Sequence, residues 1–395
     1  MTAFVLVFAV LSAIILVIHV ALSAGVAANL AAERRLRRAP AVDDGRPAPV
    51  APAAGAHAIV PEVIVAARNE AATLPRLLAG LEAQTRGDVR FLLVDDRSDD
   101  ASGGMMDEFC RRAGARARVI HNVTPPSGLT GKQAALDLAF QQASGDVLLF
   151  TDGDCEVPPC WAEEMLRHFA DERVGVVLGR IELPESPRFL EDFQAFEQPL
   201  LNQYNFGSAG IGLPTGCFGN NMAVRARAVK EVGGGFHALG FSVTEDATLL
   251  DAVRRLGSWK VSVCSSREAA CLTRAHRTWG AYVDQHTRWN AGGLFSADLV
   301  TSFSYIFVVL IYLVGSLLVL PLGFLDWRVP VLSLNAFLSI GLLAFAGGLY
   351  EGKNRPRYYA RLLPYLFFFG FFYAFITVRA VLKRPFDWKG STLRP

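Results

Sequence analysis

The chain has 395 residues, a formal net charge of +2 at pH 7 and an apolar fraction of 52%. This length suffices for one catalytic domain with additional segments, and the near-neutral charge gives no reason to expect nucleic acid as a partner. Apolar residues concentrate near the two ends, as in a membrane protein with a water-soluble middle. The six cysteines show no paired metal spacing, so inert thiols in a reducing compartment are the favoured interpretation.

An N-terminal membrane helix is predicted over residues 1–32. Ala3 to Ala32 is almost wholly apolar, and at about 1.5 Å per residue it exceeds a hydrocarbon core of about 30 Å. A cleaved signal peptide fits poorly because the first residues carry no positive charge. Four arginines follow the span between Arg34 and Arg38, which favours a cytoplasmic domain after it. Residues 33–58 are basic and then rich in Pro and Ala, as expected of a linker.

Short apolar strands alternate with helices from Pro61 onward, which predicts an α/β fold with a mostly parallel sheet. Two acidic clusters follow predicted strands, namely Asp95-Asp96 and Asp152-Gly-Asp154. Ligands bind such sheets at the carboxyl ends of strands, so both clusters are candidate site residues. The predicted strands are Glu62–Ala66, Arg90–Val94, Arg118–His121, Asp146–Phe150, Val174–Ile181 and Lys260–Cys264, and the predicted helices include those after Thr73, over Gly131–Ser144 and over Phe189–Phe206.

The C-terminal region is predicted to contain about three further membrane segments. These are Phe303–Leu325, Val329–Leu349 and Leu362–Leu382, each long enough to span. Three crossings would place the C-terminus outside, yet the tail 383–395 is basic. Either the charge rule is broken once, or one segment is re-entrant or interfacial.

The acidic clusters suggest specific chemistry. Asp152 and Asp154 suit Mg²⁺ or Mn²⁺, which take carboxylates together with substrate phosphates, although solvated turns also produce Asp-x-Asp. Asp95 and Asp96 can accept hydrogen bonds from a base or ribose. The run that follows, from Ser98 to Asp100, reads better as an Asx-rich loop that caps a helix.

Thr244-Glu245-Asp246 opens a predicted helix, with Thr244 as its N-cap. Asp246 is a candidate general base whose basicity the like charge of Glu245 would raise. The alternative is that both acids serve only the electrostatics of a helix N-terminus.

Gln285, Arg288 and Trp289 are spaced i, i+3 and i+4, so they share one helix face. An arginine fork can clamp a diphosphate, and an indole offers a flat surface to a sugar ring. An amphipathic interfacial helix before a membrane span is the competing interpretation.

The order of these motifs, followed by membrane segments, resembles the membrane-type family 2 inverting glycosyltransferases. That family includes cellulose, hyaluronan and poly-N-acetylglucosamine synthases and ceramide glucosyltransferase-like enzymes. The resemblance covers about Pro61 to Gly293 and has two departures. The first is at Val65-Ala-Ala-Arg-Asn-Glu70, where the family often has a proline before Asn-Glu. The second is the small membrane part, which favours single transfer to a lipid-embedded acceptor or polymer export with a partner subunit. It implies a GT-A, Rossmann-like domain over residues 59–295 and a transmembrane region over 296–382.

The resemblance also implies a role for each matched residue. The nucleotide would be bound by Glu70, Asp95, Asp96 and Lys132, and the donor and cation by Asp152 and Asp154. The acceptor would be bordered by Gly219, Asn220 and Asn221, and the base would be Asp246 with Glu245. Diphosphate and acceptor would also be bound by Gln285, Arg288 and Trp289.

The expected function is transfer of a hexose or N-acetylhexosamine from a UDP-sugar to a lipid-borne hydroxyl, with inversion, at the inner face of the cell membrane. A processive polysaccharide synthase that extends a growing glycan at the same site, with a possible export subunit, is the alternative. A catalytically silent sugar-nucleotide-binding scaffold of an export complex is the alternative from another class.

Overall fold

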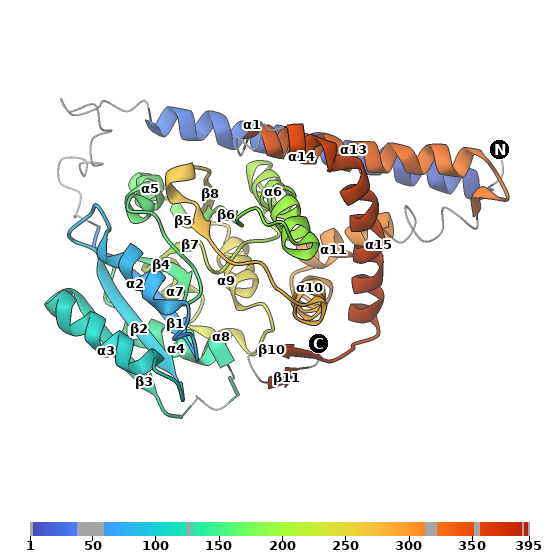
Figure 1. The fold of residues 1–395 in the computed structure, drawn as a ribbon. Coiled ribbons are helices and arrows are strands. Elements are labelled where there is room, and N and C mark those ends of the chain that lie inside the picture. The colour runs from blue at the N-terminus through green and yellow to red at the C-terminus, as the bar shows by residue number, and fades with distance from the viewer. Residues whose placement is uncertain are drawn as a thin grey trace. The chain divides into compact units, whose positions relative to one another are not determined.

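A computed structural model describes residues 3–37, 59–124, 128–129, 131–312, 322–350, 356–388 and 391–393 (Figure 1). The chain divides into two compact units, which we call the sheet unit and the helical unit. The sheet unit comprises 28–184 and 216–274, and the helical unit comprises 1–27, 185–215 and 275–395.

The sheet unit is built on a seven-stranded sheet in the order β3-β2-β1-β4-β7-β5-β8. Neighbours β3, β2, β1 and β4 are parallel, as are β5 and β8, while β7 runs antiparallel between β4 and β5. The strands are β1 (Pro61–Ala67), β2 (Arg90–Asp96), β3 (Ala117–Asn122), β4 (Val147–Asp152), β5 (Val174–Gly179), β7 (Met222–Arg225) and β8 (Lys260–Cys264). The predicted α/β class and mostly parallel sheet are therefore confirmed.

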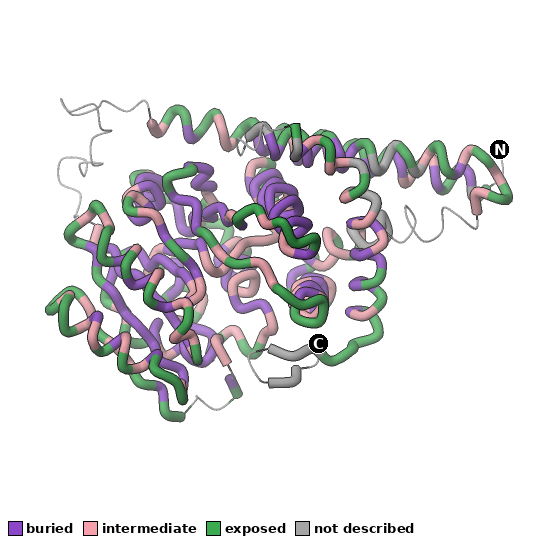
Figure 2. Tube along the Cα trace, viewed as in Figure 1, coloured by how far each residue is buried: buried purple, intermediate pink, exposed green. Residues whose placement is uncertain are grey.

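Burial explains why the central strands read as unbroken apolar runs. Every residue of β1 is buried, as are all residues of β5 and the interior of β2, and Figure 2 shows these strands as continuous buried segments. Helices that cover both faces of a parallel sheet leave no wet side, so alternation of polar and apolar residues is absent. The leucines at helical spacing in α2, for example Leu74 and Leu78, are buried against this layer.

The helices of the sheet unit follow the predicted alternation. They are α2 (Leu74–Glu82), α3 (Ser102–Ala113), α4 (Gly131–Gln142), α5 (Trp161–Leu166), α7 (Ala226–Glu231), α8 (Phe236–Leu239) and α9 (Glu245–Arg255), with 3₁₀ turns η1 (Gly114–Arg116), η2 (Arg167–Ala170) and η3 (Arg267–Ala269). A two-stranded parallel pair, β6 (Ile181–Glu182) and β9 (Cys271–Leu272), was not predicted because strands this short leave no periodic signal.

The helical unit packs long helices around an aromatic core. Phe193, Tyr282, Phe369 and Phe372 are buried at its centre, and the Tyr282 and Phe372 rings stack with centroids 4.7 Å apart. Its elements are α6 (Phe189–Gly210), α10 (Trp279–Leu294), α11 (Leu299–Tyr312), α13 (Arg328–Tyr350), α14 (Pro356–Ala360) and α15 (Leu362–Val381), with the first part of α1 (Ala3–Arg37) and a hairpin of β10 (Phe386–Trp388) and β11 (Ser391–Leu393). The hairpin was not predicted within the basic tail.

A buried carboxylate ties three of these helices together. Glu197 on α6 accepts hydrogen bonds from the Tyr282 hydroxyl at 2.5 Å and the Tyr373 hydroxyl at 2.9 Å, and the His286 ring lies 3.5 Å away. Because a buried charge is costly without such partners, this network fixes α10 and α15 against α6.

Within the described residues, α1 is the helix with the length and composition to cross a bilayer, over Val5–Arg37. It continues beyond the predicted end at Ala32, and the linker from residue 38 to 58 lies outside the described residues. The second and third C-terminal segments correspond to helices α13 and α15, and the first begins as α11 before residues 313–321, which lie outside the described part. Their crossing of a membrane stays a prediction.

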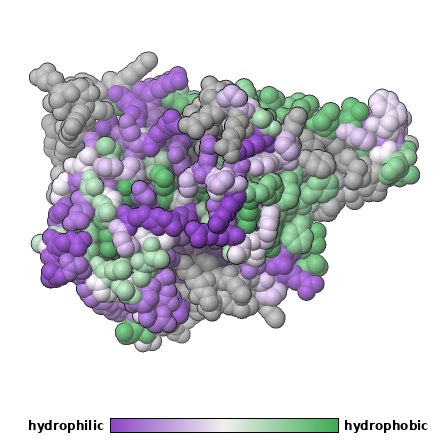
Figure 3. All heavy atoms as spheres, viewed as in Figure 1, coloured by the Kyte–Doolittle hydropathy of each residue, from purple (hydrophilic) through white to green (hydrophobic). Residues whose placement is uncertain are grey.

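Exposed apolar side chains distinguish the helical unit from the sheet unit. Leu6, Val7, Val10, Val17 and Val20 of α1 are exposed. Figure 3 shows hydrophobic residues along the visible helices of the helical unit, whereas hydrophilic residues dominate the visible surface of the sheet unit. Apolar patches of this kind mark contact with lipid or with another protein.

Replacement of Gly207 by valine should destabilise the helical unit. A Cβ at Gly207 would lie 2.6 Å from the Leu22 carbonyl oxygen, so α1 and α6 pack too closely for any side chain there. Overpacking typically costs about 1–3 kcal/mol, and we expect a thermal unfolding midpoint in detergent several degrees lower. Gly280→Ala on α10 is the control, because a Cβ there meets nothing within 4 Å. Equal midpoints for both variants would contradict this packing.

Candidate active site

The acidic clusters lie at one edge of the sheet. In the strand register Ala67 of β1 is opposite Asp95 of β2, and Ala66 is opposite Asp152 of β4. The carboxyl ends of three adjacent parallel strands therefore meet at one level. This confirms that both clusters end parallel strands, on either side of β1, at the edge where such sheets bind ligands.

Lys132 joins the end of β4 to the start of α9. Its Nζ lies 2.5 Å from Oδ1 of Asp152 and 3.5 Å from Oε1 of Glu245. Burial would lower the pKa of the Lys132 ammonium, but the carboxylates of Asp152 and Glu245 outweigh it and raise the pKa well above its ordinary value. Lys132 therefore remains a cation and offsets part of the charge of the acidic cluster. The sequence pattern predicted Lys132 beside the nucleotide but did not predict its ion pair with Glu245.

Asp246 is held by backbone donors. Its Oδ2 accepts a hydrogen bond from the Gly219 N–H at 2.7 Å, and its Oδ1 accepts one from the Ala247 N–H at 2.9 Å. A Cβ at Gly219 would lie 2.9 Å from Cβ of Asp246, so this close approach requires glycine. The glycine-rich turn and the helix start, predicted separately, thus form one substructure.

Thr244 does not cap α9 as predicted. It occupies the N-cap position, but its side chain makes no capping hydrogen bond. The Thr248 hydroxyl instead donates to the Thr244 carbonyl at 3.0 Å. The prediction failed because a threonine at this position satisfies a capping pattern whatever its side-chain rotamer.

Gln133 positions the loop that precedes α9, and sequence analysis missed it. Its Nε2 donates to the Gly240 carbonyl at 2.8 Å, and its Oε1 accepts from the Ser242 N–H at 3.3 Å. Gln133 is buried and follows Lys132 directly, so α4 supplies both the cation and the loop anchor. The sequence feature that could have indicated this role is a polar residue, Gln133, among the buried positions of α4.

The Asp-Gly-Asp turn fits a hard divalent cation. Gly153 lies against Glu70, since a Cβ there would be 3.2 Å from Cγ of Glu70. Asp152 and Asp154 flank this glycine and offer oxygen ligands. Mg²⁺ and Mn²⁺ take one or two carboxylates and complete their shell with phosphate oxygens and water.

Asp95 and Asp96 are both buried and bonded. Asp95 accepts from the Ser98 N–H at 3.1 Å and lies 3.0 Å from Nδ1 of His121, while Asp96 binds the Arg97 guanidinium at 2.9 Å and 3.0 Å. The bond to Asp95 is the first cause of a raised pKa at His121. Contact of either acid with uridine stays a prediction.

The predicted Asx loop is present after β2. Asp100 accepts hydrogen bonds from the Ser102 N–H at 2.8 Å, at the start of α3, and from the Ala71 N–H at 3.0 Å. The preference for a capping loop over a ligand site at Ser98–Asp100 is confirmed.

Asn221 braces the turn from within the core. Its Nδ2 donates to the carbonyls of Arg180 at 2.7 Å and Ala269 at 2.8 Å, and its Oδ1 accepts from Nε1 of Trp161 at 2.9 Å. Asn220 is less buried, and its Nδ2 lies 3.5 Å from the sulfur of Cys155. A role for the turn at the acceptor stays a prediction, and Asn221 would act through its position.

Gln285, Arg288 and Trp289 lie on α10, in the helical unit, as the predicted helical spacing requires. The opposite face of α10 carries the buried residues His286, Thr287 and Asn290. The predicted face is thus confirmed, and its convergence with Asp246 stays a prediction.

Comparison with known proteins supports a glycosyltransferase. Residues 62–233 match the family described as glycosyl transferase family 2. The chain is 25% identical over 236 residues to a probable glycosyltransferase, YdaM, of Bacillus subtilis, a match covering 58% of this chain and 54% of that protein. It is 34% identical over 117 residues to an undecaprenyl-phosphate 4-deoxy-4-formamido-L-arabinose transferase of Pseudomonas fluorescens, covering 29% of this chain and 32% of that protein. The chain thus spans about half or less of these curated relatives.

The fold agrees with a solved glycosyltransferase. A mannosyltransferase from Pyrobaculum calidifontis, in complex with GDP-Man and Mn2+, superposes with a TM-score of 0.51 at 16% identity, covering 94% of this chain and 99% of that one. The sheet and its acidic carboxyl edge define a GT-A-type domain. The match over residues 62–233 supports a glycosyltransferase domain similar to family 2 in this part of the chain.

Lys132→Met should lower stability, because Asp152 and Glu245 then lose their shared cation. Breaking a fully buried pair costs about 3–5 kcal/mol, and partial exposure of Asp152 reduces this to roughly 2 kcal/mol. Thermal unfolding of the purified protein measures the change. Adding Glu245→Gln to Lys132→Met should recover part of the loss, and Lys230→Met, on the exposed side of α7, should change little. A double variant no more stable than Lys132→Met would refute the shared-cation arrangement.

Proposed function

We propose that the chain transfers a hexose or N-acetylhexosamine from a UDP-sugar to a lipid-borne hydroxyl group, with inversion. The observation that carries the proposal is the Lys132 bridge, which unites the Asp-Gly-Asp turn and the Glu245-Asp246 helix start at the carboxyl edge of the sheet. Glycosyl transfer requires that the groups binding the donor diphosphate lie close to the base that deprotonates the acceptor hydroxyl.

Asp246 is the base in this proposal. Its carboxylate takes the proton of the acceptor hydroxyl as that oxygen attacks the anomeric carbon, and the bond to the UDP oxygen breaks on the opposite face. The Gly219 and Ala247 N–H groups fix the carboxylate in one orientation, so little reorganisation is needed when the acceptor arrives. Glu245, bonded to Lys132, holds the start of α9 in place.

Asp154 and Asp152 would hold the divalent cation. Bound there, Mg²⁺ or Mn²⁺ neutralises charge on the departing diphosphate. Lys132, already a cation at this turn, adds a second positive group for the same phosphates. Glu70, Asp95 and Asp96 would face the uridine, and Gln285, Arg288 and Trp289 are the candidates for binding diphosphate and acceptor.

A lipid-borne acceptor is supported by two independent features. One is the exposed apolar face of α1, which suits a bilayer. The other is the similarity to a protein named as an undecaprenyl-phosphate transferase. The arginines Arg34, Arg35 and Arg37 at the end of α1 favour a catalytic domain on the cytoplasmic side.

Asp246→Asn should reduce transfer by about 10³-fold, within the range of 10²–10⁴ for loss of a general base, while UDP binding persists. Transfer is measured by mass spectrometry of lipids from membranes incubated with the UDP-sugar. Asp88→Asn is the matched control, since Asp88 precedes β2 at the opposite edge of the sheet. Unchanged turnover in Asp246→Asn would remove the mechanism, and long polymer in place of a single-sugar lipid would favour the synthase alternative.

Removal of divalent cations with a chelator should abolish transfer, and added Mg²⁺ or Mn²⁺ should restore it. Asp154→Asn should raise the metal concentration for half-maximal activity by more than the ~10–100-fold typical of outer-shell changes, because a direct ligand is lost. Asp88→Asn should leave the metal requirement unchanged. Full activity in the chelated enzyme would exclude the metal from the mechanism.

A further inference from the structure

Three buried side chains of different chemistry meet where α1 reaches the sheet unit. Glu33 lies in the last turns of α1, His168 in the 3₁₀ turn η2, and Cys264 at the end of β8. All three are buried, with exposed fractions of 7%, 3% and 0%. Their ligand atoms all lie within 4.8 Å of one another. Far-separated segments of the chain thus bring a carboxylate, an imidazole and a thiol to one point.

The three ligand atoms are close enough to share one cation. His168 Nε2 lies 3.4 Å from Glu33 Oε2, and the Ser265 N–H and hydroxyl lie 3.2 Å and 3.4 Å from the same oxygen. Arg37 Nε lies 3.4 Å from the other carboxylate oxygen, Glu33 Oε1, and Arg37 also pairs with Glu164 at 2.6 Å. Tetrahedral Zn²⁺ with bonds of about 2.0–2.1 Å to nitrogen and oxygen separates its ligand atoms by about 3.3–3.4 Å.

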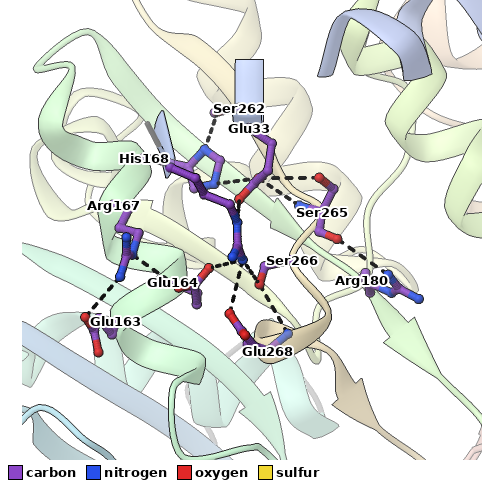
Figure 4. Close-up of polar contacts among 11 residues, drawn as sticks. Glu33, Glu163, Glu164, Arg167, His168, Arg180, Ser262, Ser265, Ser266 and Glu268 are labelled. Carbon is purple, nitrogen blue, oxygen red and sulfur yellow. Dashed lines mark hydrogen bonds and ion pairs between the residues drawn. The ribbon is translucent and has the colours of Figure 1, made fainter. Parts of the chain in front are cut away.

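His168 presents one nitrogen to this point. Its Nδ1 lies 2.8 Å from the Ser262 hydroxyl, which can fix the ring orientation (Figure 4). Its Nε2 is buried and faces Glu33 Oε2 at 3.4 Å, too long for a well-formed hydrogen bond. A zinc-bound histidine commonly has this arrangement, with one nitrogen on the metal and the other held by a second group.

We propose that Glu33, His168 and Cys264 form a structural Zn²⁺ site that fixes the end of α1 to the sheet unit. The mixed sulfur, nitrogen and oxygen set suits zinc and not Mg²⁺, which prefers oxygen ligands alone. A fourth position is left for water or for the Ser265 hydroxyl. This site is separate from the Asp152–Asp154 turn and serves no step of the transfer.

Cysteine binds zinc as the thiolate, so zinc binding by Cys264 would release the thiol proton. The ion pairs of Arg37 with Glu164 and Glu268 lie beside the site and tie the same helix end.

The test is the zinc content of the full chain purified in detergent, measured by elemental mass spectrometry after dialysis against Zn²⁺ and removal of excess metal. We expect about one Zn²⁺ per chain in the parent protein and a loss of at least tenfold in Cys264→Ser and in His168→Gln. Cys271→Ser is the matched control, because Cys271 is also buried but lies outside the cluster. Zinc should raise the thermal unfolding midpoint of the parent and of Cys271→Ser, and not that of Cys264→Ser.

Cobalt gives a readout that does not depend on the variants. Co²⁺ bound in place of zinc should show a sulfur-to-cobalt charge-transfer band in the parent protein, which Cys264→Ser loses. Substoichiometric zinc in the parent, or equal zinc in the parent and both cluster variants, would overturn the proposal and leave a hydrogen-bonded ion pair. Neither readout uses transfer activity, so failure here leaves the proposed function standing.

Discussion

The site depends on one cation, Lys132, shared between carboxylates from distant parts of the chain. Asp152 ends β4, and Glu245 begins α9 beside Asp246. Three acids brought together at a strand edge repel one another, and part of that cost must be offset before a substrate arrives. Lys132 offsets it from the first turn of α4, where Gly131 has a positive φ of 57° that suits glycine. An incoming diphosphate and metal would then meet an acidic cluster whose charge is already partly offset.

The sequence predicted the strands, their parallel arrangement and the acidic edge because these follow from local patterns. Buried strands such as β1 appear in the sequence as apolar runs. Acidic residues at the carboxyl ends of β2 and β4 must lie at the same edge, because the strands are parallel. The bond from Gly219 to Asp246 and the bridge from Lys132 to Glu245 could not be read in the same way. Both join segments whose proximity is set by packing and not by spacing.

Other failures have equally physical origins. Thr244 matched a capping pattern, but a cap depends on a rotamer that sequence does not specify. The zinc site proposed at Cys264 could not be read from the sequence, because Glu33 and His168 lie in other segments and motif spacing detects only ligands that are near in sequence. Gln285, Arg288 and Trp289 were placed correctly on one helix face, since helical periodicity alone decides that question.

A structure of the protein bound to UDP and Mn²⁺ tests the central claim most directly. The account predicts Mn²⁺ within coordination distance of the Asp154 carboxylate and the diphosphate, with Lys132 at the same phosphates and the Asp246 carboxylate open to the acceptor side. Nucleotide bound away from the carboxyl edge of β1, β2 and β4, or Asp246 on the far side of α9 from the diphosphate, would contradict it.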